Sequence, residues 1–137
     1  MRQYIERLSQ VPLFSECSPK ELEHLSRILD EVNLPAGRVM AAQGEHGREM
    51  FIIVSGSASV VRDGEAIADL GPGDYFGELA LLDAGPRTAT VVATDAIDVL
   101  VIGRQQFNTV LDEVPGLARR LLTTTARRLR EASTGLV

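Results

Sequence analysis

Apolar residues at helical spacing open the chain. Tyr4, Ile5 and Leu8 recur at the three- and four-residue spacing of a helix face. The stretch 11–14, which contains a proline, interrupts this pattern. The first segment is therefore expected to be a short helix that ends before residue 11.

A second helix has a complete start signal. Ser18 is a suitable N-cap, Pro19 fits the first helical position, and Glu21 completes an S-x-x-E capping box. The apolar positions that follow form one stripe, made of Leu22, Leu25, Ile28 and Leu29. We expect residues 1–32 to be helical.

From residue 33 the pattern changes to short apolar runs separated by turns. Nine glycines fall between Gly37 and Gly85. The pair Asp63-Gly64 between two such runs predicts a two-residue hairpin, whose central residues need positive φ. The predicted strands are 39–41, 50–55, 58–62, 66–70, 88–93 and 97–102. Several short strands with regular turns indicate a small β-barrel or sandwich over 33–103.

Helical spacing returns after Gly103. One helix is predicted over 104–113 and, after a break near Pro115, a longer one over 116–133. The longer helix has one face made of Leu117, Leu121, Thr125, Leu129 and Ala132. Helices, a compact β unit and further helices in this order predict an α+β fold, taken as a single domain over residues 1–137.

Candidate binding chemistry is concentrated in residues 76–91. Gly77 and Glu78 begin a short helical turn, whose unpaired backbone N–H groups favour an anion. Arg87 lies past the following loop, and its guanidinium fork suits two phosphate oxygens. A carboxylate beside them can accept hydrogen bonds from a sugar hydroxyl. Together these parts suit a ribose phosphate. Taken singly, Glu78 could instead stabilise the helix dipole, and Arg87 could be a solvated loop residue.

The whole segment resembles a known motif. FGELALLDAGPRTATV, residues 76–91, is similar in sequence and loop length to the phosphate-binding cassette of the cyclic-nucleotide-binding domain family. VPLFSECSPKELEHLSRIL, residues 11–29, resembles the entry to that family's β-roll. The resemblance extends over essentially the whole chain. It implies an antiparallel β-roll, or jelly-roll barrel, flanked by N-terminal helices and by C-terminal hinge and lid helices.

The same resemblance implies a role for each matched position. Glu78 would accept the ribose 2′-hydroxyl, and Gly77 would lie against the ribose. Arg87 would pair with the cyclic phosphate, and Thr88 would add a hydroxyl contact to phosphate or purine. Leu79 and Ala80 complete the implied ligand-binding set, Ala80 through its backbone N–H. The implied ligand is a cyclic nucleotide, with cAMP preferred and cGMP possible, and no cofactor is implied.

The last helix carries a second resemblance. Its run from Ala126 to Ser133 is similar to the long dimer helix of catabolite-activator-type bacterial transcription regulators. This implies a homodimer through residues 116–133, contact between Ser133 or Thr134 and the base, and C-terminal helices that rearrange when ligand binds. The five arginines of residues 115–137 are open to two interpretations: a solvated helix face, or contacts with the acidic β-roll or a partner.

Composition narrows the possible functions. A net charge of −5 argues against a nucleic-acid-binding surface, and no helix-turn-helix is recognisable. The longest apolar run, Met50–Val54, is far shorter than a membrane span, and the chain is expected to be soluble and cytoplasmic. The single cysteine, Cys17, excludes an internal disulfide, while His24 and His46 lie too far apart to suggest a metal site.

The sequence leaves three alternative functions open. The first is a non-enzymatic cyclic-nucleotide sensor, either alone or as one piece of a longer bacterial regulator. The second is a module with the same fold that dimerises without a ligand. The third is a small-barrel enzyme of the cupin type, which needs clustered metal ligands that this sequence lacks.

Overall fold

The computed structural model describes residues 2–78, 81 and 85–132, and begins with a helical N-terminal region. The elements are α1 (Arg2–Ser9), a 3₁₀ turn η1 (Pro12–Phe14) and α2 (Pro19–Ile28). The predicted capping box is present. Glu21 N donates to Ser18 Oγ over 3.2 Å, and Ser18 N donates to Glu21 Oε1 over 2.9 Å.

The predicted helical boundary at residue 32 is wrong. Leu29 is already extended, with φ −91° and ψ 140°, and strand β1 (Asp30–Leu34) follows directly. Leu29 is still buried, so the apolar stripe is correct although the backbone leaves the helix there. β1 pairs with β8 (Ile97–Gly103), and this long-range pairing overrides the local helical pattern.

In the part of the chain that the structure describes, eight strands form two four-stranded antiparallel sheets, which confirms the predicted α+β fold with a β-roll. The orders are β1-β8-β3-β6 and β2-β7-β4-β5. The remaining strands are β2 (Val39–Ala41), β3 (Glu49–Ser55), β4 (Ala58–Arg62), β5 (Glu65–Leu70), β6 (Tyr75–Phe76) and β7 (Thr90–Ala93). The β4–β5 hairpin has the predicted positive φ, 54° at Asp63 and 82° at Gly64.

One predicted strand begins later in the structure, and one short strand has no counterpart among the predicted strands. β7 begins at Thr90, two residues later than predicted, because residues 88 and 89 form a bend. β6 was not predicted; its two residues pair with Phe51 and Ile52 of β3. A strand of two residues has too few side chains to show an alternating pattern.

The central strands β3 and β8 separate two apolar cores. Ile52 and Leu100 face the helices, whereas Ile53 and Val99 face the interior of the roll. All four side chains are fully buried. Successive residues of a strand point to opposite faces, so two short strands serve both cores.

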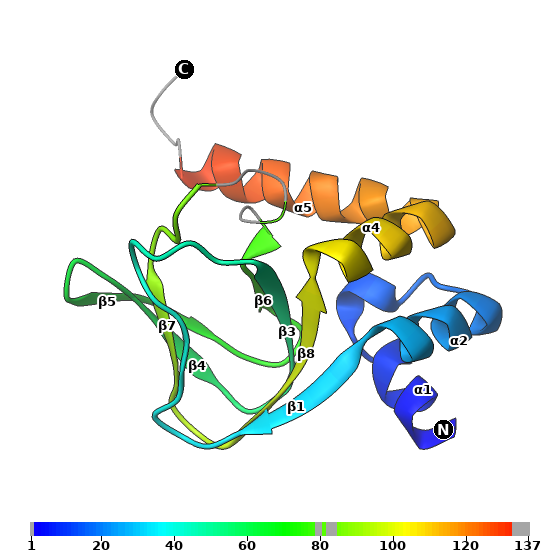
Figure 1. The fold of residues 1–137 in the computed structure, drawn as a ribbon, viewed down its shortest axis with the longest axis horizontal. Helices are drawn as coiled ribbons and strands as arrows, with labels where there is room; N and C mark the ends of the chain where they lie inside the picture. Colours follow the sequence, from blue (N-terminus) through cyan, green and yellow to red (C-terminus); the bar gives the residue numbers. More distant parts are fainter. Residues whose placement is uncertain (1, 79–80, 82–84, 133–137) are drawn as a thin grey trace.

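The C-terminal helices lie on the helical side and over one end of the roll. They are α4 (Arg104–Glu113) and α5 (Pro115–Ala132). In Figure 1, α1, α2 and α4 gather beside the roll, while α5 runs over it. None of the described helices combines the length and apolar character needed to cross a membrane.

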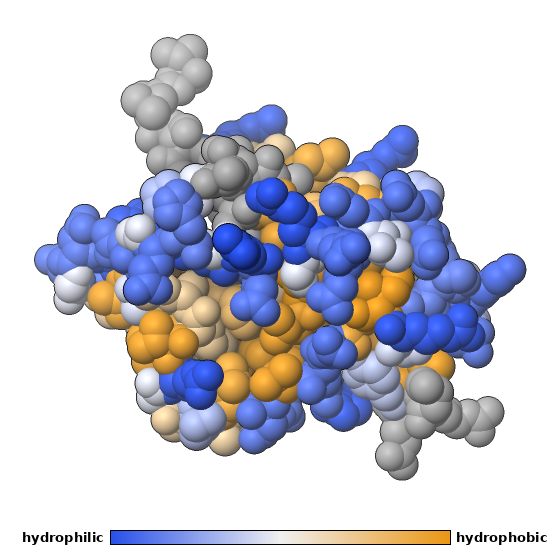
Figure 2. Space-filling model, viewed as in Figure 1, coloured by the Kyte–Doolittle hydropathy of each residue, from blue (hydrophilic) through white to orange (hydrophobic). Residues whose placement is uncertain are grey.

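Some apolar surface remains in contact with solvent. Figure 2 shows apolar side chains over the roll, between hydrophilic ones. The large exposed apolar residues are Val32, Val39, Ile67 and Leu122. Leu122 is the most exposed of these, at 60%, and it lies on α5.

Candidate functional site

A cavity of about 380 Å³ lies where the predicted cassette meets the strands of the roll. Its size is in the range of small-molecule sites. One part of the wall is apolar and comes from Ala41, Val60, Leu70 and Val91. Another is polar or charged and includes Gly77, Glu78, Arg87 and Thr88. The cavity can therefore hold a ligand with an apolar part and an anionic part.

Gly77 allows the chain to pass close to Arg87. Its φ is +88°, which side-chain-bearing residues rarely adopt. A Cβ at this position would lie 2.5 Å from Arg87 Nη1 and 2.7 Å from Glu49 O. Glycine is therefore required here both for its conformation and for space. Glu78 follows it and is buried, with only 5% of its surface exposed.

Arg87 is fixed through both its backbone and its guanidinium. Its backbone N donates to Glu45 O over 2.8 Å, and its carbonyl accepts from Gly44 N over 2.9 Å. Nη2 donates to Glu49 O over 2.7 Å, and Nη1 makes a long contact of 3.5 Å with Gly77 O. The positive charge is thus placed beside Gly77 at the cavity wall.

The electrostatics of the cavity favour an anion at Arg87. Burial lowers the pKa of the Arg87 guanidinium, while the carboxylates of Glu49 and Glu78 oppose that change. The arginine keeps its proton at neutral pH, since its ordinary pKa is far above 7. Its nearest polar partners are backbone carbonyls, which do not neutralise it. A partly desolvated positive charge of this kind attracts a ligand anion.

The structure brings together four of the seven ligand-binding residues that the sequence predicts. Gly77, Glu78, Arg87 and Thr88 line one cavity, although Thr88 is exposed and lies before β7 instead of within it. The other three, Leu79, Ala80 and Ser133, lie outside the described residues.

A family model named "Cyclic nucleotide-binding domain" matches residues 31–114. This chain belongs to the cyclic nucleotide-binding domain family. The matched span includes both sheets and the cavity at Gly77, Glu78 and Arg87. The family resemblance predicted from the sequence is therefore confirmed.

Individual relatives of this family member are regulatory proteins. A cAMP-dependent protein kinase regulatory subunit of Aspergillus niger is 37% identical over 87% of this chain and 29% of the relative. A CRP-like cAMP-activated global transcriptional regulator of Mycobacterium tuberculosis is 31% identical over 96% of this chain and 61% of the relative. The chain thus spans less than two thirds of either protein. The crystal structure of Thermus thermophilus catabolite activator protein is similar with a TM-score of 0.83 and 33% identity, over 91% of this chain and 61% of that one.

In this family member α5 contributes to the cavity a side chain that is not among the predicted ligand-binding residues. Arg128 of α5 reaches the cavity, where its Nη1 lies 3.3 Å from Glu78 Oε1 and 3.0 Å from Tyr75 O. Its guanidinium carbon lies 4.3 Å from the centre of the Tyr75 ring, a cation–π arrangement. Of the two interpretations of the C-terminal arginines, contact with the roll is therefore correct for Arg128.

The remaining arginines of α5 differ in their surroundings. Arg120 pairs with Glu16 over 3.2 Å and donates to Leu13 O, so it contacts the N-terminal region. Arg119, Arg127 and Arg130 are exposed, as the solvated-face interpretation expects. Arg128 and Glu78 are 50 residues apart in the sequence, so no local pattern could indicate their contact.

Two buried hydroxyl groups lie at the contact between α5 and the roll. Tyr75 Oη and Thr125 Oγ1 have no hydrogen-bond partner within the described part of the chain. Burial raises the pKa of Tyr75, and the nearby Thr124 and Arg128 oppose that change. Buried polar groups are usually paired, so this contact is less well satisfied than the rest of the core.

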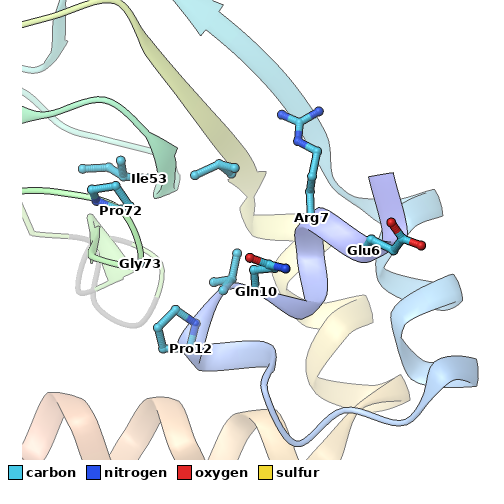
Figure 3. Close-up of a pocket in the computed structure, with 9 residues that line it drawn as sticks. Glu6, Arg7, Gln10, Pro12, Ile53, Pro72 and Gly73 are labelled. Carbon is cyan, nitrogen blue, oxygen red and sulfur yellow. The ribbon is translucent and has the colours of Figure 1, made fainter. Parts of the chain in front are cut away.

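A larger cavity, of about 640 Å³, lies between the N-terminal helices and the roll. Figure 3 shows Glu6, Arg7 and Gln10 on one side of it and Ile53, Pro72 and Gly73 on the other. The guanidinium of Arg7 pairs with Glu31 of β1, which neutralises it. Its glycine, Gly73, is far in the sequence from Glu6 and Arg7, and the ion pair with Glu31 makes Arg7 a poor partner for a ligand anion.

The two histidines lie apart and on different elements. His24 is on α2, where its Nδ1 lies 2.9 Å from Glu113 Oε2 of α4. His46 forms an isolated β-bridge with Pro86. Among the described residues, no three His, Cys, Asp or Glu side chains are grouped as a metal site would need.

Proposed function

We propose that this chain is a sensor for a 3′,5′-cyclic nucleotide, with cAMP preferred and cGMP accepted. One observation carries the proposal: Gly77, Glu78 and Arg87 line a single cavity that also has an apolar wall. The anionic phosphate binds at Arg87, the ribose lies against Gly77, and the purine lies on the apolar wall. The relatives named for cAMP support the ligand class. The chain has no catalytic role and works in the bacterial cytoplasm.

Each polar residue has a distinct role in this proposal. Glu78 accepts a hydrogen bond from the ribose 2′-hydroxyl, and Arg87 turns its guanidinium to the phosphate oxygens. Thr88 adds a hydroxyl contact at the cavity rim. The backbone of Leu79 and Ala80 completes the phosphate site, and Ser133 contacts the base.

The ligand signal is proposed to pass through α5. Arg128 holds the same carboxylate, Glu78, that the ribose uses. A ligand that binds Glu78 changes the surroundings of Arg128, and Tyr75 Oη and Thr125 Oγ1, at the same contact, have no hydrogen-bond partner among the described residues that a shift of the helix would break. A ligand moves such an equilibrium only through its differential affinity for the two arrangements. Hydrogen exchange along residues 104–132 is therefore expected to change with saturating cAMP.

Titration calorimetry with cAMP and cGMP tests the ligand and the site. The wild-type chain is expected to bind both, and Arg87→Ala is expected to weaken binding about ten- to a hundredfold, because a charge-assisted contact is lost. Arg38→Ala is the matched control, since Arg38 is exposed and lies outside the cavity. Undiminished binding by Arg87→Ala contradicts the assigned site.

A second function is favoured by the exposure of Leu122. This side chain is 60% exposed on α5, and the small residues Ala118 and Ala126 lie one turn away on either side. An apolar position between small residues suits close packing of two copies of α5, through residues 116–133. The second candidate is therefore a homodimerisation module that needs no ligand.

Sedimentation analysis separates the two functions. If α5 forms the dimer, Leu122→Glu is expected to convert dimers to monomers, while Arg127→Glu, an exposed neighbour, keeps the dimer. A dimer whose stability does not depend on cAMP, in a chain that does not bind cAMP, supports the second function. A wild-type chain that stays monomeric at all concentrations contradicts it.

A further inference from the structure

A third arginine, Arg62, lines the cavity in addition to Arg87 and Arg128. It is the last residue of β4, and it lines the cavity together with Val60 of the same strand. Residues two apart on a strand share one face, so Arg62 and Val60 face the same side. Val60 belongs to the apolar wall, on which a planar base is expected to lie.

The Arg62 side chain is held at the rim of the cavity. Its Nε donates to Thr88 O over 3.1 Å. The guanidinium of Arg87 turns away from this point, toward Glu49 O and Gly77 O. The two arginines thus serve different parts of the cavity, Arg87 the Gly77 side and Arg62 the Thr88 side.

The backbone beside Arg62 is also fixed. Gln43 Nε2 donates to Asp63 Oδ1 over 2.8 Å, and Asp63 N donates to Gln43 Oε1 over 2.9 Å. Gln43 N in turn donates to Thr90 Oγ1 over 2.9 Å. Gln43 therefore ties its own turn at 42–45 to the β4–β5 hairpin through its side chain and to β7 through its backbone N–H. A hairpin held at its tip can present a side chain to a ligand in one place.

We infer that Arg62 is a base-selecting residue of the cyclic-nucleotide site and favours purines that carry a 6-oxo group. The inference rests on the proposed function. With Nε bound to Thr88 O, the two Nη nitrogens carry the remaining donors. Guanine presents two adjacent acceptors, O6 and N7, which match this fork. Adenine presents an acceptor at N7 and a donor at N6, so one of the two contacts becomes unfavourable. Arg62 thereby raises the affinity of the site for cGMP and makes its preference for cAMP over cGMP smaller.

The test compares three nucleotides by calorimetric titration: cAMP, cGMP and cyclic IMP. Cyclic IMP carries O6 and N7 but lacks the 2-amino group of guanine. Arg62→Leu is expected to weaken cGMP and cyclic IMP by about five- to tenfold and to leave cAMP nearly unchanged. Arg62→Lys is expected to lose most of the same selectivity, because it keeps the charge and loses the planar fork. Arg38→Leu, outside the cavity, controls for loss of an exposed arginine.

Each outcome decides the question. An equal loss for all three nucleotides in Arg62→Leu means that Arg62 serves the phosphate, and unchanged affinity for all three means that it does not contact the nucleotide; both outcomes overturn the inference. A wild-type chain that binds none of the three overturns the proposed function itself. Thermal melting checks that each variant is folded. If Arg62→Leu does not fold, Arg62→Lys still tests the inference.

Discussion

The two halves of helix α5 contact the rest of the molecule in different ways. In the first half, Leu117 and Leu121 are buried in the same apolar core as Leu25 and Leu100. In the second half, Thr125 places an unpartnered hydroxyl against the roll, as judged among the described residues, and Arg128 reaches Glu78 and Tyr75. One end is held by apolar packing and the other by polar contacts at the cavity.

This difference shows where a ligand can act on the helix. Apolar packing is insensitive to a charged ligand, so we expect it to hold the first half of α5 in place whether or not a ligand is bound. Polar contacts at the cavity compete directly with a ribose or phosphate. We therefore expect ligand binding to shift the second half of α5, while the helix stays fixed near Leu121.

The largest effect is expected from Leu121→Ala. The side chain is only 4% exposed, and truncation of a buried leucine typically costs about 2–5 kcal/mol of unfolding free energy. Leu122→Ala is the matched control, because its side chain is 60% exposed and surface changes stay within about 0.5 kcal/mol. Urea denaturation of a dilute sample measures both. Equal losses in the two variants mean that α5 does not pack as described.

A smaller effect is expected from Arg128→Met. Glu78 is buried, and loss of Arg128 removes the cation with which its carboxylate pairs directly. Because the Arg128 side chain is 39% exposed, solvent screens the pair, and we expect a loss of about 1–2 kcal/mol. In a double-mutant cycle, Glu78→Gln is expected to recover part of that loss, since a neutral amide needs no counter-charge. Strictly additive losses argue that the two side chains do not interact.

The smallest effects are expected from two tyrosines. Tyr4 Oη donates to Leu29 O over 3.0 Å, so Tyr4→Phe is expected to cost about 0.5–1.5 kcal/mol. Tyr75→Phe removes a buried hydroxyl that has no partner among the described residues, and it is expected to be neutral or slightly stabilising. Thermal unfolding of the two variants side by side gives the comparison. If Tyr75→Phe lowers the stability as much as Tyr4→Phe does, the hydroxyl of Tyr75 has a hydrogen-bond partner. The second half of α5 is then held to the roll more tightly than described.

Local signals in the sequence were sufficient for most elements of the fold. The Ser18–Glu21 capping box, the Asp63-Gly64 hairpin and the break at Pro115 all act over a few residues, and the structure has each of them. β1 was missed because Asp30 and Glu31 continue the polar face of α2, while the strand exists only through pairing with β8. β6 was missed because two residues show no periodicity.

The candidate site divides in the same way. Gly77, Glu78 and Arg87 lie within eleven consecutive residues, so a single motif indicated all three. Two further arginines reach the cavity from distant parts of the sequence. Arg62 is 26 residues from its partner Thr88, and Arg128 is 50 residues from its partner Glu78. In the sequence nothing marked Arg62, and contact with the roll was one of two open interpretations for the arginines of α5, because only the fold brings both side chains to the cavity.

The absence of a side chain at Gly47 has a consequence for the design of nucleotide sensors. A methyl group there would lie 1.8 Å from Arg87 Nε and 2.0 Å from the guanidinium carbon. The end of an arginine is flexible, so Gly47→Ala would push the Arg87 guanidinium, the group proposed to bind the phosphate, away from Glu49 O. The affinity, and with it the concentration window in which a fluorescent reporter built on this domain responds, could thus be tuned through the position of Arg87 by a change at a residue that does not itself line the pocket.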